Sequence, residues 1–418
     1  MESLKINDNI NLYYVPMKKL KTTSIGVYIH RALNIEESSK NAVLPYVMKR
    51  GCKLCPDSSA VAKYLENLYG ASLGAGILKR GDDHIIYFGF ETISDKYAPG
   101  KESLTADGIK LMMSVLFEPD AFDDETVMQE KKNASDRITA EMNDKRQYAQ
   151  LRCSEEMCKG ESFALSRLGT KEGVEAITAD GLRKHYEKII TSSAVDIYVC
   201  GDADINALGE EIKKYTSKLD FEVANIVKTS IFEGHGGVKR ITDNMDVVQG
   251  KLSMGFRTSV AADSTDYIPL MVMNSIFGGG AHSKLFNNVR EKLSLCYYAS
   301  SSTVRNKGIM FVNAGIEFQN FEKAYDEILV QLDAVKNGDI SDLEFESSVN
   351  AIINELESYN DDQNAIQFFY LSEKIAGTNY DIDELKAKIS RVTIEDVKRV
   401  AKNIELDTVY FLSGKEEA

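Results

Sequence analysis

One structural unit is written twice along this chain, and this repetition constrains the fold more than any other feature. Residues 71–91, ASLGAGILKRGDDHIIYFGFE, align without gaps with residues 297–317, YYASSSTVRNKGIMFVNAGIE. Both segments place a short polar turn between two strand-like runs, which predicts a β-hairpin in each copy. A gapless match over both strands predicts an internal duplication.

The segments that flank the two hairpins also correspond, and they occur in the same order. Residues 23–30 and 250–260 each alternate like a half-buried strand. The segment ITADGLRKHYEKI resembles VTIEDVKRVAKNI, and Thr178 and Thr393 are the predicted N-caps of these two helices. A last strand follows each helix, as VDIYVCGD in the first copy and DTVYFLSGK in the second.

These elements predict an α+β protein with two tandem homologous domains, each a mostly antiparallel sheet with helices packed on one face. We assign residues 1–228 to the first domain, 229–240 to a glycine-rich linker and 241–418 to the second domain. The chain has 418 residues, of which 43% are hydrophobic. It is therefore long enough to bury two cores.

Charge and composition exclude several functions. A formal net charge of −14 argues against broad nucleic-acid binding. No run of about 18 apolar residues predicts a membrane span, and the first residues lack the charged-then-apolar layout of a signal peptide. Six cysteines in a chain of this length do not form a small-domain disulfide framework. We expect a reducing, cytoplasmic location.

The most specific motif spans residues 274–298, NSIFGGGAHSKLFNNVREKLSLCYY. Its helix, glycine turn, S-x-L-F helix start and R-E-K-x-x-L-x-Y resemble the pitrilysin / insulinase / mitochondrial processing peptidase family. The segment VDIYVCGD resembles the strand that closes this family's first domain. The resemblance covers nearly the whole chain. It implies a LuxS/processing-peptidase-like half-clamshell, two of which face each other around a closed chamber with one active site.

The zinc motif of that family is absent. In that family the motif is H-x-x-E-H on a helix, where two histidines bind zinc and the Glu is the general base. No two histidines of this chain lie within one helical turn of each other: His30, His84, His185, His235 and His282. We therefore expect this chain to bind no metal and to be inactive alone.

The resemblance also identifies the residues at the vacated positions. Matching Arg50-Gly51 to the K-G that follows the family motif places Ala42 and Tyr46 at the histidines and Pro45 at the glutamate. Because proline is disfavoured inside a helix, we expect this helix to start close to Pro45. The candidate caps are Ser38, Ser39 and Asn41.

The family's third zinc ligand is a Glu from a later helix, which should lie in residues 128–146. The best register places Arg137 at that position, and a slip of a turn or two would instead place Glu130 or Glu141 there. A cation at this point would repel a metal. The family also binds substrate along a strand edge that usually has the sequence N-A. In this chain Gly74-Ala75 match that pair, so the Asn is missing.

Arg290 and Tyr297 match the Arg and Tyr of the family's R-E-K-x-x-L-x-Y motif. By resemblance they lie opposite the metal and donate hydrogen bonds to the substrate carbonyl or to the oxyanion. A chain that keeps these donors without zinc ligands predicts complementation. It would supply Arg290 and Tyr297 in trans to a homologous zinc-bearing subunit, with a peptide as substrate.

Three hypotheses follow. The leading one is a non-catalytic subunit of a heterodimeric zinc endopeptidase, similar to the inactive partner in bacterial pairs associated with elongation-factor P modification. The second is a structural or peptide-binding homodimer. The third is an independent enzyme that uses the Cys52/Cys55 and Cys153/Cys158 pairs as a metal or redox site. Cys158 follows Cys153 at i, i+5 in a predicted helix, where the two thiols point apart.

Overall fold

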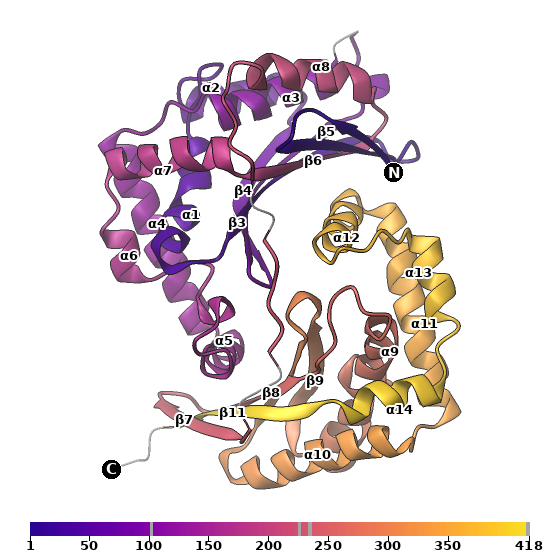
Figure 1. Ribbon diagram of the computed structural model, residues 1–418. Coiled ribbons are helices and arrows are strands. Elements are labelled where there is room, and N and C mark those ends of the chain that lie inside the picture. Colours follow the sequence, from indigo (N-terminus) through magenta and orange to yellow (C-terminus); the bar gives the residue numbers. More distant parts are fainter. Residues whose placement is uncertain (101–102, 225–226, 233–235, 415–418) are drawn as a thin grey trace. The chain divides into compact units, whose positions relative to one another are not determined.

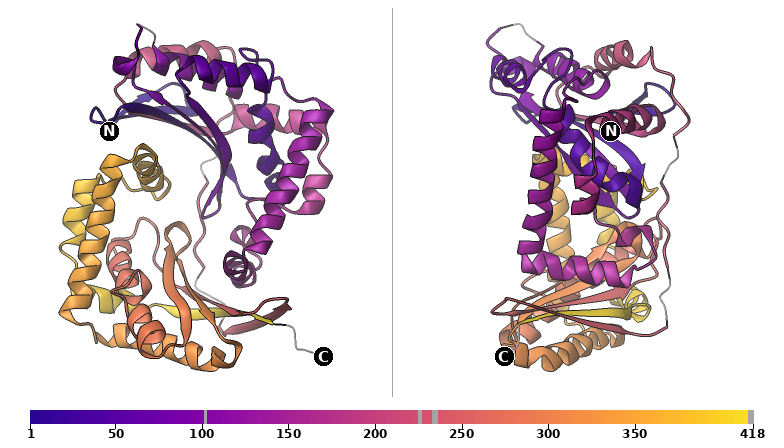
Figure 2. Two further views of the ribbon diagram at one scale, coloured as in Figure 1. Left: turned by 180° about the vertical axis from the view of Figure 1, so that it is seen from behind. Right: turned by 90° about the vertical axis from the view of Figure 1, so that its left-hand side faces the viewer.

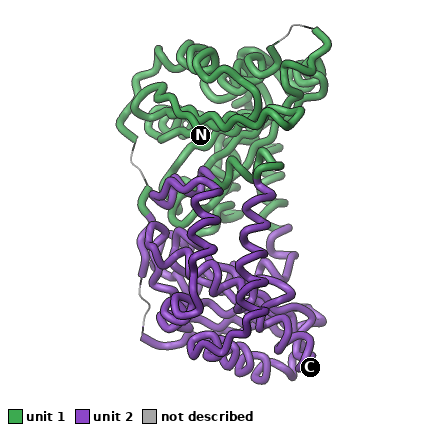
Figure 3. Tube along the Cα trace, turned by 90° about the vertical axis from the view of Figure 1, so that its right-hand side faces the viewer, with its two compact units in different colours: residues 1–139, 165–228, 360–369 green, residues 140–164, 229–359, 370–418 purple. Residues whose placement is uncertain are grey.

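The computed structural model describes residues 1–100, 103–224, 227–232 and 236–414. Its contacts divide the chain into two compact units (Figure 3). The units have these segments: Met1–Thr139, Leu165–Lys228 and Asn360–Phe369 in the first, and Ala140–Ala164, Thr229–Tyr359 and Tyr370–Ala418 in the second. The predicted domains, 1–228 and 241–418, follow the repeated sequence and are a different division. Residues 233–235 of the predicted linker lie outside the described residues.

The first unit is built on one sheet. Its strands are β1 (Glu2–Lys5), β2 (Ile10–Pro16), β3 (Thr22–Ala32), β4 (Ser72–Arg80), β5 (Asp83–Ile93) and β6 (Ala194–Gly201). Among the described residues they form a six-stranded sheet in the order β1-β2-β6-β3-β5-β4 (Figure 1). All neighbours are antiparallel except β2 and β6, which run parallel.

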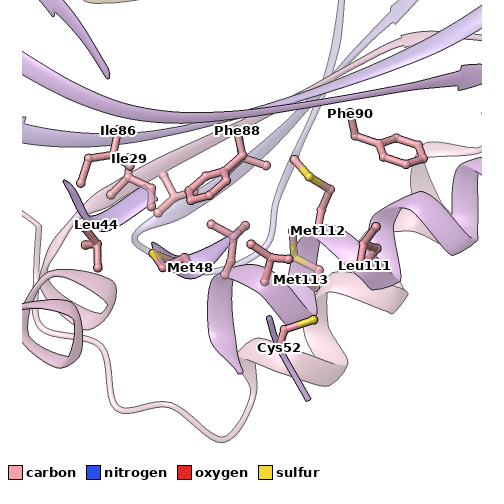
Figure 4. Close-up of a cluster of buried hydrophobic side chains, with 14 of the residues drawn as sticks. Ile29, Leu44, Met48, Cys52, Ile86, Phe88, Phe90, Leu111, Met112 and Met113 are labelled. Carbon is pink, nitrogen blue, oxygen red and sulfur yellow. The ribbon is translucent and has the colours of Figure 1, made fainter. Parts of the chain in front are cut away.

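Helices cover one face of this sheet (Figures 1 and 2). They are α1 (Ile35–Met48), α3 (Leu104–Phe117), α7 (Ala179–Ser192) and α8 (Ile205–Thr216), with α2 (Ser58–Asn67), α4 (Asp124–Asn143) and α6 (Lys171–Glu175) beside them. Every second residue of β3, namely Ile25, Val27 and Ile29, enters the core beneath these helices, as the period of a strand requires. Figure 4 shows Leu44 and Met48 of α1 in the same cluster.

The second unit repeats this plan. Its strands are β7 (Lys239–Met245), β8 (Gly250–Arg257), β9 (Cys296–Val304), β10 (Ile309–Ile316) and β11 (Glu405–Gly414). Its helices are α9 (Tyr267–Gly278), the π-helical η3 (Leu285–Lys292), α10 (Phe321–Asn337), α11 (Asp342–Ser358), α13 (Ile382–Ile389) and α14 (Ile394–Lys402). Across both units, the short 3-10 turns of the described chain are Asp95–Tyr97, Ser162–Ala164, Arg305–Lys307, Phe318–Asn320 and Tyr359–Asp361. No helix within the described residues is long and apolar enough to cross a bilayer.

Strand order confirms the duplication. The second sheet runs β7-β11-β8-β10-β9, and the first runs β2-β6-β3-β5-β4 after the added β1. Each sheet has one parallel pair, β2 with β6 and β7 with β11, at the same place in the order. The two predicted hairpins are β4–β5 and β9–β10. Thr178 and Thr393 cap α7 and α14 as predicted.

The helix after α4 packs in the second unit. This helix, α5 (Lys145–Met157), lies against β8, β10 and β11, on the face away from α10 and α14 (Figure 1). Buried ion pairs fix the segment that follows it. Glu161 Oε1 lies 2.8 Å from Arg257 Nη2, Glu161 Oε2 lies 2.8 Å from Lys307 Nζ, and Asp407 Oδ2 lies 3.1 Å from Arg257 Nε.

The start of α12 (Gln363–Ile375) belongs in turn to the first unit. Gln363 Nε2 donates to the carbonyls of Thr22 at 2.7 Å and Cys200 at 3.0 Å. Gln367 Nε2 donates to Ser24 Oγ at 2.9 Å. These polar contacts cover part of the sheet face that the other helices of the first unit leave free.

Candidate functional site

The helix that carries the vacated positions starts earlier than the proline suggested. Asn34 Oδ1 accepts the backbone N–H of Glu37 at 2.9 Å, and this N-cap starts α1 at Ile35. Pro45 is buried inside the helix, so the expected start close to Pro45 was wrong. An interior proline costs about 3 kcal/mol, and the burial of most of α1 in the core outweighs this cost.

Three of the four residues predicted to stand at vacated ligand positions come together in the first unit. Ala42 and Tyr46 lie one turn apart on α1, so their side chains share one face. Arg137 reaches them from α4. Its guanidinium lies 3.8 Å from the centre of the Tyr46 ring, and its Nη2 donates to the Ala42 carbonyl oxygen at 3.4 Å.

This arrangement does not fit zinc. Ala42 has no donor atom and is fully buried, Pro45 offers neither a base nor an N–H, and Arg137 brings a fixed positive charge to the point where a carboxylate ligand is needed. No group of three or more His, Cys, Asp or Glu side chains in the described ranges is placed to hold a metal ion.

The two alternative residues for the third position have other surroundings. Glu130 is buried, and its Oε1 accepts Nε of Arg50 at 2.7 Å. Its other oxygen accepts Asn133 Nδ2 at 3.1 Å. Glu141 lies in the last turn of α4, which belongs to the second unit. Of the three candidates, Arg137 is the one that contacts α1 in the described structure, and the register itself stays a prediction.

The cysteines sit in two separate environments. Cys52 and Cys55 are buried in the first unit, whereas Cys153 and Cys158 are buried in the second. Burial raises the pKa of Cys55 to about 11 and that of Cys153 to about 12. At neutral pH both are thiols, which are poor nucleophiles and poor metal ligands. Cys200 is a fully buried core residue.

Sequence reasoning missed a buried ionic cluster on the first sheet. His30 lies between two carboxylates, with Nδ1 2.6 Å from Asp83 Oδ2 and Nε2 3.2 Å from Asp196 Oδ2. Burial alone would lower the pKa of His30, but hydrogen bonds to Asp196 and Asp83 raise it to about 9. The imidazolium therefore links β3, β5 and β6. These contacts join residues far apart in sequence, so no local signal could have indicated them.

Two further histidines contact Asn41 of α1. Asn41 joins the two rings: His185 Nε2 lies 2.7 Å from Asn41 Oδ1, and His84 Nδ1 lies 3.2 Å from Asn41 Nδ2. Burial lowers the pKa of each of these histidines to about 4. Both are therefore neutral structural groups. His282, in the second unit, lies 3.0 Å from Ser275 Oγ through its Nε2, and His235 lies outside the described residues.

Arg290 lies in the last turn of η3 in the second unit. Its side chain is 41% exposed. The guanidinium stacks 4.6 Å from the ring centre of Phe286, and its Nε lies 3.5 Å from Glu291 Oε1. Because the side chain is partly exposed and its ionic contact is through Nε, its terminal N–H groups can still reach a carbonyl or an oxyanion.

Tyr297 lies at the start of β9 and is 63% exposed. The register of β9 against β10 shifts there, since Gly315 pairs with Tyr298 and Ile316 pairs with Cys296. Such a β-bulge re-aims a side chain at the edge of a sheet. The Tyr297 hydroxyl donates to Glu317 Oε1 at 3.0 Å, and this hydrogen bond raises the pKa of Tyr297. The phenol therefore stays protonated and remains a donor.

Gly74-Ala75, the predicted substrate edge, lies on β4, the last strand in the order of the first sheet. Gly74 is exposed and pairs with Gly89 of β5. A Cβ at Gly89 would meet no atom within 4 Å. This part of the sheet therefore presents bare backbone, which is what an added strand requires.

The described residues define a class of protein: a two-unit α+β chain with a duplicated sheet and, within the described ranges, no group of side chains placed to hold zinc. The model of a protein family described as "Peptidase M16 inactive domain" matches residues 176–352 of this chain. The chain is 37% identical over 413 residues to "Probable inactive metalloprotease YmfF" of Bacillus subtilis (strain 168), covering 98% of this chain and 97% of the relative.

Solved structures agree. A conserved protein from Enterococcus faecalis V583 superposes with a TM-score of 0.92 at 29% identity, covering 100% of this chain and 99% of the other. A peptidase M16 inactive domain from Pseudomonas fluorescens superposes with a TM-score of 0.79 at 17% identity, covering 100% and 98%. The chain belongs to the M16 peptidase family, which confirms the resemblance seen in residues 274–298 and the predicted fold class.

Proposed function

We propose that this chain is the non-catalytic subunit of a heterodimeric M16 zinc endopeptidase. In this role it closes the chamber, binds extended peptide, and supplies Arg290 and Tyr297 to the zinc site of a homologous partner. One observation supports the proposal: Arg290 and Tyr297 are exposed on the second unit, while Ala42 and Arg137, at the positions predicted for zinc ligands, contact each other and offer no ligand atom.

The two donors have properties that suit this chemistry. Peptide hydrolysis at a metal passes through a tetrahedral intermediate with a negatively charged oxygen, which preorganised donors stabilise. Arg290 is permanently charged, and the pKa of Tyr297 is raised by its hydrogen bond to Glu317. Tyr297 can exchange that hydrogen bond for one to substrate, because its side chain lies largely in solvent.

Peptide binding is the second part of the proposal. Among the described residues no further strand pairs with β4 on its outer side, and Gly74 adds no side chain there. A peptide that adds as a further strand gains main-chain hydrogen bonds without a sequence requirement. This suits a subunit that holds substrate while its partner cleaves it.

A structural or peptide-binding homodimer is the second candidate. The observation that favours it is that both donors already have partners within the chain: Tyr297 binds Glu317, and Arg290 contacts Phe286 and Glu291. A scaffold would keep these contacts permanently, and no reaction would then depend on them.

Reconstitution tests the proposal. The tagged chain is used to capture partners from the native cell extract, and the captured M16 subunit with intact H-x-x-E-H is then produced separately. Peptidase activity is measured for each chain alone and for the pair. Arg290→Ala and Tyr297→Phe should each lower kcat of the pair by about 10²–10³, the cost of one lost oxyanion donor. Arg399→Ala, which removes an exposed, ion-paired cation of α14, is the control and should change little.

The outcomes separate the candidates. Activity that requires both chains and falls with Arg290→Ala supports complementation. Full activity of the pair with both substitutions would refute the donation of these residues. A self-associating chain that captures no zinc-bearing subunit would favour the homodimer.

A further inference from the structure

A cationic corner lies beside Tyr297 on the second sheet. We use this name for Arg146 of α5, Lys251 of β8 and Tyr298 of β9. Tyr298 and Lys251 both pair with Gly315 of β10, so the three residues form one row across the sheet. A Cβ at Gly315 would lie 2.5 Å from the Tyr298 ring, so the glycine is what allows the ring to lie flat over β10 toward Lys251.

Arg146 contacts the Tyr298 ring and has few polar contacts. Its guanidinium lies 4.2 Å from the Tyr298 ring centre. Its side chain donates one long hydrogen bond, from Nη2 to Ser300 Oγ at 3.4 Å. Within the described ranges Arg146 forms no ion pair. A guanidinium held beside a ring, with N–H groups that no carboxylate occupies, can offer two of them to the fork of a carboxylate.

Lys251 adds a second cation to the same ring. Its Nζ lies 5.9 Å from the Tyr298 ring centre and donates to Gln249 Oε1. No carboxylate pairs with it in the part of the chain that the structure describes. Burial, and then the charge of Arg146, lower the pKa of Lys251. The repulsion between the charges of Arg146 and Lys251 costs free energy, and a bound anion would offset this repulsion.

Other charged groups face the corner as well. Asp144 lowers the local potential, but its Oδ1 already accepts the N–H groups of Arg146 and Gln147 at 3.1 Å each. Lys145 does not belong to the corner, because its Nζ contacts the Met142 carbonyl oxygen at 3.0 Å and Met245 Sδ of β7 at 3.7 Å. The balance at the corner is therefore positive in a chain whose net charge is −14.

We propose that Arg146, Lys251 and Tyr298 form a carboxylate-binding subsite for an acidic peptide that runs along β9. This inference rests on the proposed function, because Tyr298 directly follows Tyr297 and β9 is the last strand of its sheet. A peptide held by Tyr297 would bring a neighbouring residue over the Tyr298 ring. The carboxylate is either an acidic side chain or the C-terminus of the peptide.

Peptide pools test the subsite on the full chain. Four pools of N-acetylated peptides of random sequence, without other acidic residues and with amidated C-termini except where stated, are passed over the immobilised protein, and retained peptides are quantified by mass spectrometry. One pool has a fixed central Glu, and its match has Gln. A third ends in a free carboxylate, and its match ends in an amide. We expect retention of at least one acidic pool to exceed its match by about tenfold, as one charge-assisted hydrogen bond would give.

Variants assign that preference to the corner. The double variant Arg146→Gln, Lys251→Gln should abolish the preference while it leaves retention of the neutral pools unchanged. Arg399→Gln, which makes the same kind of charge change on α14, should keep the preference. Circular dichroism of each variant checks folding, and Arg146→Lys, which keeps the charge without the fork, should retain part of the preference.

Each result has a distinct meaning. Equal retention of acidic and neutral pools, or a preference that survives in the double variant, would overturn the subsite and leave the proposed function intact. If no pool is retained, the peptide-binding part of the proposed function fails, and the subsite fails with it. Which acidic pool is preferred identifies the source of the carboxylate.

Discussion

The vacated site can be refilled if Ala42, Tyr46 and Arg137 stand where the ligands of a zinc site belong. We predict that the variant Ala42→His, Tyr46→His, Arg137→Glu binds one zinc ion per chain. The two new histidines lie one turn apart on α1, and the new carboxylate projects from the α4 position whose guanidinium now lies 3.8 Å from the Tyr46 ring centre. This supplies the His₂Glu set of a catalytic zinc site.

The free energies can be worked out from the contacts. Ala42 is fully buried, so a larger side chain costs about 1–3 kcal/mol in overpacking. Loss of the stack between Arg137 and Tyr46 costs about 0.5–2 kcal/mol. Zinc at a free concentration of 100 times Kd restores about 2.7 kcal/mol. The metal-free variant should therefore unfold more easily than the parent chain, and zinc should reverse much of that loss.

Metal analysis after gel filtration and thermal unfolding with and without zinc measure this. The control variant, Ala42→His, Arg137→Glu, keeps Tyr46 and so lacks one ligand. It should bind zinc far more weakly. If the folded triple variant binds no more zinc than this control, then the three positions are not those of a zinc site, and the register that places Arg137 is wrong.

Three further predictions concern stability. The pKa of His30 is raised from 6.5 to about 9, so its contribution is complete below pH 6.5 and is lost as pH rises toward 9. Urea unfolding should therefore show up to about 3 kcal/mol less stability at the upper end. Glu161→Gln removes the partner of the buried Arg257 and Lys307, and should destabilise the second unit by about 3–5 kcal/mol in urea titrations. Pro45→Ala restores a helical N–H to α1 and should raise the melting temperature, with a gain of up to about 3 kcal/mol.

The duplicated sheets could be predicted because hairpins are local. The gapless match of residues 71–91 with 297–317 became β4–β5 and β9–β10, since alternation and a short turn specify such a pair on their own. The exchange of α5 and the start of α12 between units could not be predicted. An apolar helix face indicates that a helix is buried, and does not say which sheet buries it.

In the candidate site, too, features set by neighbouring residues could be predicted, and contacts between residues distant in sequence could not. The start of α1 was misjudged because Pro45 was given more weight than Asn34, although Asn followed by acidic residues is a local N-cap signal that could have placed it. The ionic cluster of His30, Asp83 and Asp196 had no such signal. Its members are distant in sequence and meet only because β3 pairs with both β5 and β6.

Arg137 shows how α4 and α1 can be held together without a metal. In a zinc peptidase the ion couples its ligand helices, and the free energy of metal binding becomes free energy of folding. Here the guanidinium joins α4 to α1 instead, through the Tyr46 ring and the Ala42 carbonyl. The replacement is weaker than a metal, at about 0.5–2 kcal/mol for the stack, but it needs no metal and carries the charge that excludes one. If Ala42, Tyr46 and Arg137 stand at the family's ligand positions, the contact that holds α4 on α1 also places a positive charge where a metal would otherwise bind.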